Sequence, residues 1–142
     1  MRKYYIFMIK GEYYNIYMKN NHILYQTLKT LANISVDNSS YGLELYNQIC
    51  DLFDTKRISK YFENINSKKQ GNKYIVDFCN QITTFYVRNS CLVCITENNR
   101  PSILRVLTYY YPYLFACDFI NNDYFFLNRS SLYPSKGLYS MN

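Results

Sequence analysis

The sequence predicts an α+β fold, in which four or so helices pack on a single sheet of about five to six mostly antiparallel strands. The chain has 142 residues, 49% of them hydrophobic, which is enough for one domain with a sizeable core. An aromatic, β-prone run opens the chain, and helical patterns separate it from three β-prone runs with very short connections. Because such connections join antiparallel neighbours, we expect a meander. Residues 1–128 should form the folded core of a single domain spanning 1–142, and 129–142 a loose tail.

The first half of the chain predicts one strand followed by helices. Residues 3–9 are apolar enough for a central strand. In 12–18, Tyr13, Ile16 and Tyr17 have helical spacing and should share one face of a short helix. A longer helix is expected over about 21–33 and a third behind the capping cluster 37–40, with buried stripes of Leu24, Leu28, Leu31 and Ala32, and of Leu43, Tyr46, Ile49, Cys50 and Phe53. A weaker helical pattern begins at 54, and the polar stretch 66–72 predicts a loop.

The second half predicts strands at 73–79, 82–88 and 91–96, with a tight reversal at Asn89-Ser90. Asn98 to Pro101 is typical of a helix start, because proline in the first turn loses no hydrogen bond. Ile103, Leu104, Leu107 and Tyr111 should form the buried stripe of that helix, which Pro112 ends. Two last strands are then expected, at 113–119 and 124–127, joined by a turn at 121–123.

Residues with catalytic or metal-binding chemistry are few. His22 is the only histidine, and we expect it at the surface near a helix start. Cys91 and Cys94 have a metal-site spacing, but residues three apart on a strand point to opposite faces, so we interpret them as core cysteines. The four glycines form no phosphate-binding pattern. We therefore expect no enzyme, and no catalytic residue, metal, cofactor or small-molecule substrate.

The location of the protein is predicted from its apolar runs and cysteines. No run approaches the roughly 20 apolar residues that cross a bilayer, and the opening residues do not fit a signal peptide. The cysteines lie mostly in apolar, strand-like runs, as in a reducing compartment. We expect a cytoplasmic protein with no membrane contact.

Charge and aromatic content leave two classes of partner open. The formal charge is +6, and basic residues concentrate at Lys56, Arg57, Lys60, Lys68, Lys69 and Lys73. A small basic nucleic-acid-binding module is the alternative function, since basic residues among aromatics can hold a backbone and stack bases. A solvated face explains the same charges. The 18 tyrosines fit either an AT-rich genome or exposed binding anchors, and composition does not separate the two.

Two stretches resemble one family. The opening, YYIFMIKGEYYNIYM at 4–18, and the closing segments 103–107, 112–119 and 124–128 are similar to the sporulation inhibitor of replication (SirA) family of Bacillus-type bacteria. The resemblance covers about half of the chain, at its two ends. It implies a protein that binds domain I, the N-terminal domain of the replication initiator DnaA, and so inhibits the initiation of chromosome replication on entry into sporulation. No direct nucleic-acid contact is expected.

The resemblance also implies which residues face the partner. The positions that match the family's partner-facing aromatics are Tyr13 and Tyr17, just after the first strand, and Gln48 is the matching position on the third helix. Packing of a short helix on the core is the alternative interpretation of the two tyrosines.

Overall fold

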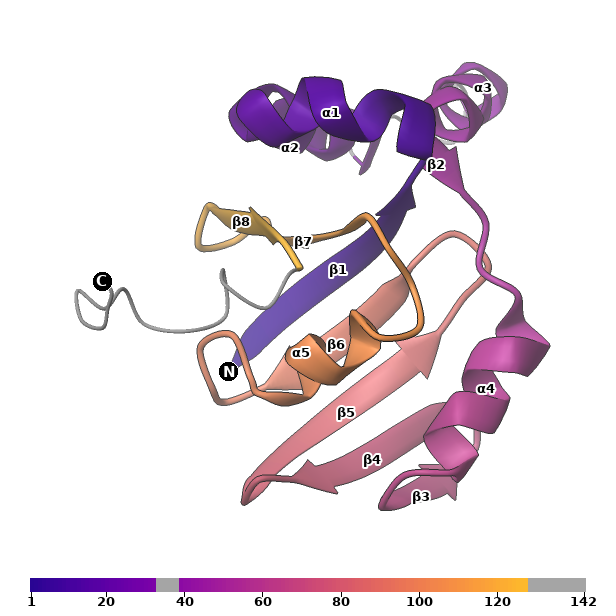
Figure 1. Cartoon of the computed structure of the whole chain (residues 1–142), viewed down its shortest axis with the longest axis vertical. Helices are drawn as coiled ribbons and strands as arrows, with labels where there is room; N and C mark the ends of the chain where they lie inside the picture. Colours follow the sequence, from indigo (N-terminus) through magenta and orange to yellow (C-terminus); the bar gives the residue numbers. More distant parts are fainter. Residues whose placement is uncertain (33–38, 128–142) are drawn as a thin grey trace.

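Strand β1 (Arg2–Ile9) lies in the interior of the sheet in the computed structural model, which describes residues 1–32 and 39–127. β1 lies between β6 (Leu92–Thr96) and β7 (Leu114–Asp118), with Tyr4 opposite Cys94 and Phe7 opposite Phe115. The full order is β3-β4-β5-β6-β1-β7-β8, with β2 paired to the end of β1, and the pairs are antiparallel (Figure 1). The prediction of a central first strand is confirmed.

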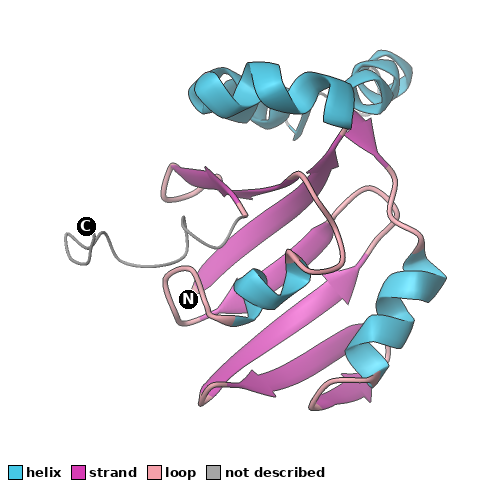
Figure 2. Cartoon of the chain, viewed as in Figure 1, coloured by secondary structure: helices cyan, strands magenta, loops and turns pink. Residues whose placement is uncertain are grey.

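The other elements follow in chain order (Figure 2). The helices are α1 (Gly11–Lys19), α2 (Asn21–Ala32), α3 (Ser39–Ile49), α4 (Thr55–Glu63) and α5 (Ile103–Leu107). The strands are β2 (Cys50–Asp51), β3 (Ser67–Gln70), β4 (Lys73–Phe78), β5 (Gln81–Val87) and β8 (Asp123–Phe126). The described part of the chain thus has eight strands and five helices, more than the sequence predicted.

The two strands that the sequence did not predict, β2 and β3, are both short. The predicted loop at 66–72 is wrong in part, because β3 pairs with β4 across a turn in which Gly71 has a φ of +62°. β3 is an edge strand, so its backbone pairing needs no apolar side chain. The predicted third helix was too long, because α3 ends at Ile49 and Cys50 pairs with Ile9 instead.

The helix before the closing strands also differs from its prediction. α5 begins at Ile103 and not at Asn98–Pro101, and it is only five residues long. Its apolar stripe is as expected, because Ile103, Leu104 and Leu107 are buried. The predicted tail, and the cluster at 37–38 that was expected to cap the third helix, lie outside the described residues.

Helices cover both faces of the sheet (Figure 1). Side chains alternate along β1, so Tyr4 and Ile6 belong to one core and Phe7 and Ile9 to the other. α4 and α5 cover the first core, and α1, α2 and α3 cover the second. The second core contains Phe7, Ile9, Leu24, Tyr25, Leu28, Tyr46, Ile49, Cys50, Cys91, Val93, Phe115, Cys117 and Phe126.

Candidate protein-binding surface

The helix that carries the two predicted tyrosines sits at a corner of the molecule. The Ile9 N–H donates to the Tyr113 carbonyl at 3.0 Å, and the Lys10 N–H donates to the Ile49 carbonyl at 2.8 Å. The Lys10 carbonyl then accepts from the Tyr13 N–H, at 2.9 Å, as α1 begins. These hydrogen bonds fix the first turn of α1 against the end of α3 and the start of β7.

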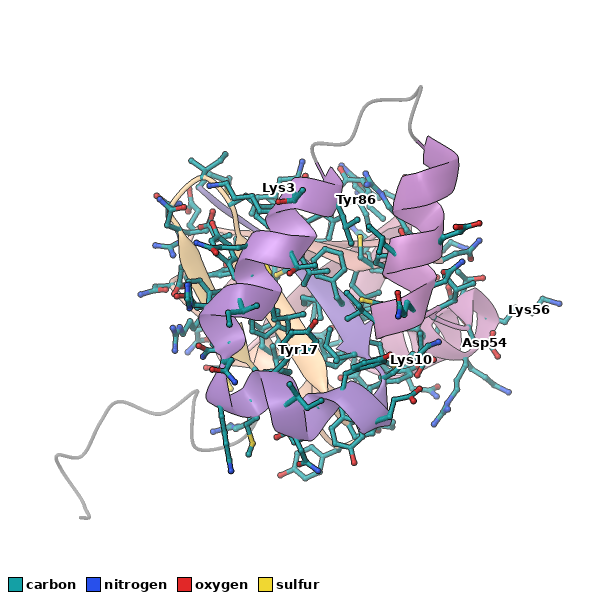
Figure 3. All side chains as sticks on the ribbon, turned by 90° about the horizontal axis from the view of Figure 1, so that it is seen from above. Lys3, Lys10, Tyr17, Asp54, Lys56 and Tyr86 are labelled. Carbon is teal, nitrogen blue, oxygen red and sulfur yellow. The ribbon has the colours of Figure 1, made fainter. Side chains whose placement is uncertain are left out.

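Tyr13 and Tyr17 lie half-buried on the side of α1 that packs on the second core. Figure 3 labels Tyr17 on this helix. Their ring centroids are 6.4 Å apart, and neither ring is sealed inside the molecule. α1 has no fully buried residue at all. Packing on the core therefore accounts for the buried part of each ring, and the exposed part is available to a partner.

Tyr14, and not Ile16, packs on the second core beside Tyr13 and Tyr17. Its ring centroid lies 4.4 Å from that of Tyr113 and 5.1 Å from that of Phe126. Ile16 is 58% exposed, so the prediction that it shares the face of Tyr13 and Tyr17 is wrong. The reason is angular: at 100° per residue, positions 13, 14 and 17 form the narrow inward stripe and position 16 falls on its flank.

Exposed apolar side chains surround this corner. Met18, on the other flank of α1, is 46% exposed, and Ile23 at the start of α2 is 47% exposed. A nine-residue helix that exposes an Ile and a Met besides two half-buried tyrosines offers more apolar area than its own packing uses. The sequence did not predict that Ile16 and Met18 are exposed, because apolar side chains on a short helix resemble core residues.

Gln48 is exposed on the last turn of α3. It immediately precedes Ile49, whose carbonyl receives the Lys10 N–H at the start of α1. The structure therefore brings the end of α3 next to the first turn of the helix that carries Tyr13. We name Tyr13, Tyr17, Ile16, Met18 and Gln48 the corner surface.

The cysteines and the histidine lie where the sequence placed them. Cys94 belongs to the first core and Cys91 to the second, which confirms that they point to opposite faces of β6. Burial raises the pKa of Cys50 to about 12 and raises the pKa of Cys91, so these thiols stay protonated at neutral pH. His22 is exposed. Within 1–32 and 39–127, no three His, Cys, Asp or Glu residues are grouped to hold a metal ion.

An ion-pair network that the sequence did not reveal closes the far end of β1. Arg2 Nε lies 3.0 Å from Asp118 Oδ2, without the alignment of a hydrogen bond, and Asp123 pairs with both Arg2 and Arg100. Asp118 also stabilises the turn that follows β7, because its Oδ1 accepts from the N–H groups of Ile120 and Asn121. Asp118 is only 1% exposed, and we interpret the network as structural.

The basic concentration lies on α4, β3 and β4, on the other side of the sheet from α1. Lys56, Arg57, Lys60, Lys68 and Lys69 are exposed there. Most aromatic side chains of the neighbouring strands and of α4 are buried, including Tyr61, Tyr74 and Phe85, so they offer no rings for base stacking. β3 is also an edge strand, where lysines commonly block pairing with other chains.

None of the helices in the described residues is long and apolar enough to span a membrane.

Comparisons with known protein families and with curated proteins identify no relative of this chain. The sequence matches no known protein family and none of the curated proteins with which it was compared. The likeness of residues 4–18, 103–107, 112–119 and 124–128 to the sporulation inhibitor family therefore stays a resemblance between those segments.

Proposed function

We propose that this protein acts by binding another protein through the corner surface, and that its partner is domain I of the replication initiator DnaA. The observation that carries the proposal is the half-burial of Tyr13 and Tyr17 on a helix with no fully buried residue. Half-buried tyrosines make good anchors, because the fold already restricts their rotamers while the exposed part of each ring can be covered by a partner. The choice of DnaA rests on the resemblance alone.

The action on replication would be steric. A stable complex of ordinary size covers about 800 Å² on each partner. An area of that size on domain I would block the contacts through which initiators self-associate at the origin. Occlusion needs no reactive group, which is consistent with protonated buried thiols and a single exposed histidine.

The test is a binding titration with purified domain I from the same organism. We expect Tyr13→Ala and Tyr17→Ala each to weaken binding by about 2 kcal/mol, and Gln48→Ala to weaken it less. Tyr109→Ala is the matched control, because Tyr109 is an exposed tyrosine that follows α5 on the opposite side of the sheet. Thermal unfolding of each variant separates lost binding from lost folding.

Three results would count against the proposal. Wild-type affinity of both tyrosine variants would show that the corner surface is not the binding site. Tight binding to duplex DNA, with an affinity that falls steeply with salt and on substitution of Lys56 and Lys60, would favour the nucleic-acid alternative. If the protein binds neither domain I nor DNA, the choice of DnaA as the partner is refuted.

A further inference from the structure

A cavity of about 600 Å³ lies between the last turn of α2 and the sheet, away from the corner surface. Its floor is formed by Tyr5 and Phe7 of β1 and by Cys91. Phe119 and Ile120, from the turn between β7 and β8, form one wall. Lys3, Lys29 and Ala32 complete the lining. The volume falls within the range of small-molecule sites, about 300–1,000 Å³.

The helices leave this side of the sheet partly open. Seen from above, α1, α2 and α3 form three sides of a frame over the second core (Figure 3). Lys3 lies by the end of α2, and Tyr86 lies in the opening between α2 and α3.

The walls of the cavity are aromatic and already fixed by their neighbours. The rings of Tyr5 and Phe119 have centroids 5.5 Å apart, and the ring of Tyr25 stacks on Phe119 at 5.7 Å. The Tyr25 hydroxyl donates to Asn122 Oδ1 at 2.9 Å, which holds the wall against α2. A ligand with an apolar body would lose little free energy in ordering such a site.

Two ammonium groups beside this apolar surface form no ion pair within residues 1–32 and 39–127. The ion pairs among the side chains that the structure describes involve Arg2 and Arg100, and neither Lys3 nor Lys29. Lys29 Nζ contacts only neutral groups, Asn122 Oδ1 at 3.3 Å and the ring of Tyr25. Lys3 Nζ lies over the ring of Tyr5, 5.3 Å from its centroid. An anion between these lysines would gain from both charges.

We propose that this cavity binds a small amphipathic anion, an alkyl or aryl carboxylate. Its apolar body would lie over Tyr5 and Phe7, and its carboxylate would pair with Lys3 and Lys29. The sequence analysis expected no small-molecule substrate, because it found no catalytic or phosphate-binding motif, and the residues that meet here are far apart in the chain. This site is separate from the corner surface, so its occupancy does not depend on the protein partner.

The proposal is tested by titrating the ¹⁵N-labelled full chain with decanoate, below its micellar concentration. Decan-1-ol and decyltrimethylammonium are the neutral and cationic controls with the same chain length. We expect saturable binding of decanoate, with amide shifts centred on Tyr5, Phe7, Lys29 and Phe119. The alcohol should bind roughly tenfold more weakly and the cation more weakly still, since the lysines attract only the anion.

Two sets of variants test the contributions of the lysine charges and of the cavity volume separately. Lys3→Gln with Lys29→Gln should weaken decanoate binding roughly tenfold and leave decanol binding unchanged, while Lys19→Gln on α1 should alter neither. Ala32→Phe should fill the cavity and abolish binding, whereas Thr30→Phe, also at an exposed site on α2, should not. Equal affinity for decanoate and decanol, equal effects of the two phenylalanines, or shifts centred on α1 would each overturn the proposal.

Discussion

The backbone N–H of Lys10 and the carbonyl of Ile49 form a 2.8 Å hydrogen bond that joins two helices far apart in the chain. Lys10 is the last residue before α1, and Ile49 is the last residue of α3. The proposed partner-facing residues of both helices are therefore placed relative to one another by this contact. Its removal should disturb the corner surface more than a change in any one exposed side chain there.

Lys10→Pro should destabilise the protein. The φ of Lys10, −62°, is already that of proline, so the substitution removes the N–H without a change of backbone angle. The Ile49 carbonyl loses its donor and meets the proline ring, and we expect the free energy of unfolding to fall by about 1–3 kcal/mol. Urea unfolding would measure this. Lys10→Ala keeps the N–H, and equal stability of the two variants would show that the hydrogen bond contributes nothing.

Ile16→Glu should weaken partner binding while leaving the fold intact. Ile16 is 58% exposed, so the change in unfolding free energy should stay within about 0.5 kcal/mol. A carboxylate in the middle of an apolar contact should lower the affinity for domain I at least about tenfold. Ile82 is also 58% exposed, on β5, and Ile82→Glu is the matched control. A titration in which both variants bind equally well would remove Ile16 from the corner surface.

Asp118→Ala should cost more stability than Asp123→Ala. Asp118 is 1% exposed, accepts two backbone N–H groups and lies beside Arg2, so its loss leaves several partners unpaired. We expect about 2–4 kcal/mol for Asp118→Ala. Asp123 and its arginines are each more than a fifth exposed, where solvent screens the pairs, and about 1 kcal/mol is expected. Denaturant unfolding of both variants at one salt concentration gives the comparison, and the reverse order would contradict it.

The protein should lose stability in alkali through its buried thiols. Burial raises the pKa of Cys50 from 9.0 to about 12. Between these values the unfolded chain releases the proton and the native state keeps it, so stability falls as pH rises above 9. The contribution of Cys50 at pH 10 is a loss of about 1.4 kcal/mol. Unfolding free energies at pH 8 and pH 10 should therefore differ less in Cys50→Ala than in the wild type, and an unchanged difference would refute the assignment.

Lys68→Val with Lys69→Val should cause self-association. Both lysines lie on β3, the edge strand next to β4, and both are exposed. Valine favours strands and removes the charges that prevent pairing with a second chain. Light scattering should detect oligomers at concentrations where the wild type is monomeric. Lys56→Val with Lys60→Val removes the same charge on α4 and is the control. If only that variant formed oligomers, the edge of β3 would not be the cause of self-association.

The sequence predicted those helices and strands whose apolar side chains follow a pattern typical of a helix or a strand. The continuous apolar run at 3–9 predicted β1 inside the sheet, and the strand period placed Cys91 and Cys94 on opposite faces. β3 was missed because its four residues are polar, and edge pairing uses backbone groups that carry no apolar signal.

The surfaces were harder to predict than the elements. The positions of Tyr13 and Tyr17 on a short helix followed from spacing, but Ile16 did not, because spacing cannot tell which side of a helix meets the sheet. The cavity was not predictable, since it forms only where the ends of α2, β1 and the β7–β8 turn meet. Such sites depend on contacts between distant segments, and a local pattern does not encode them.

The place of β1 between β6 and β7 has a consequence for how the protein is made. During synthesis β1 emerges before β6 and β7, so Tyr4 must await Cys94 and Phe7 must await Phe115. Until then both of its backbone edges and its aromatic side chains are available to other chains. Nascent chains released before residue 118 should therefore aggregate or recruit chaperones, and folding should be slow for a domain of this length.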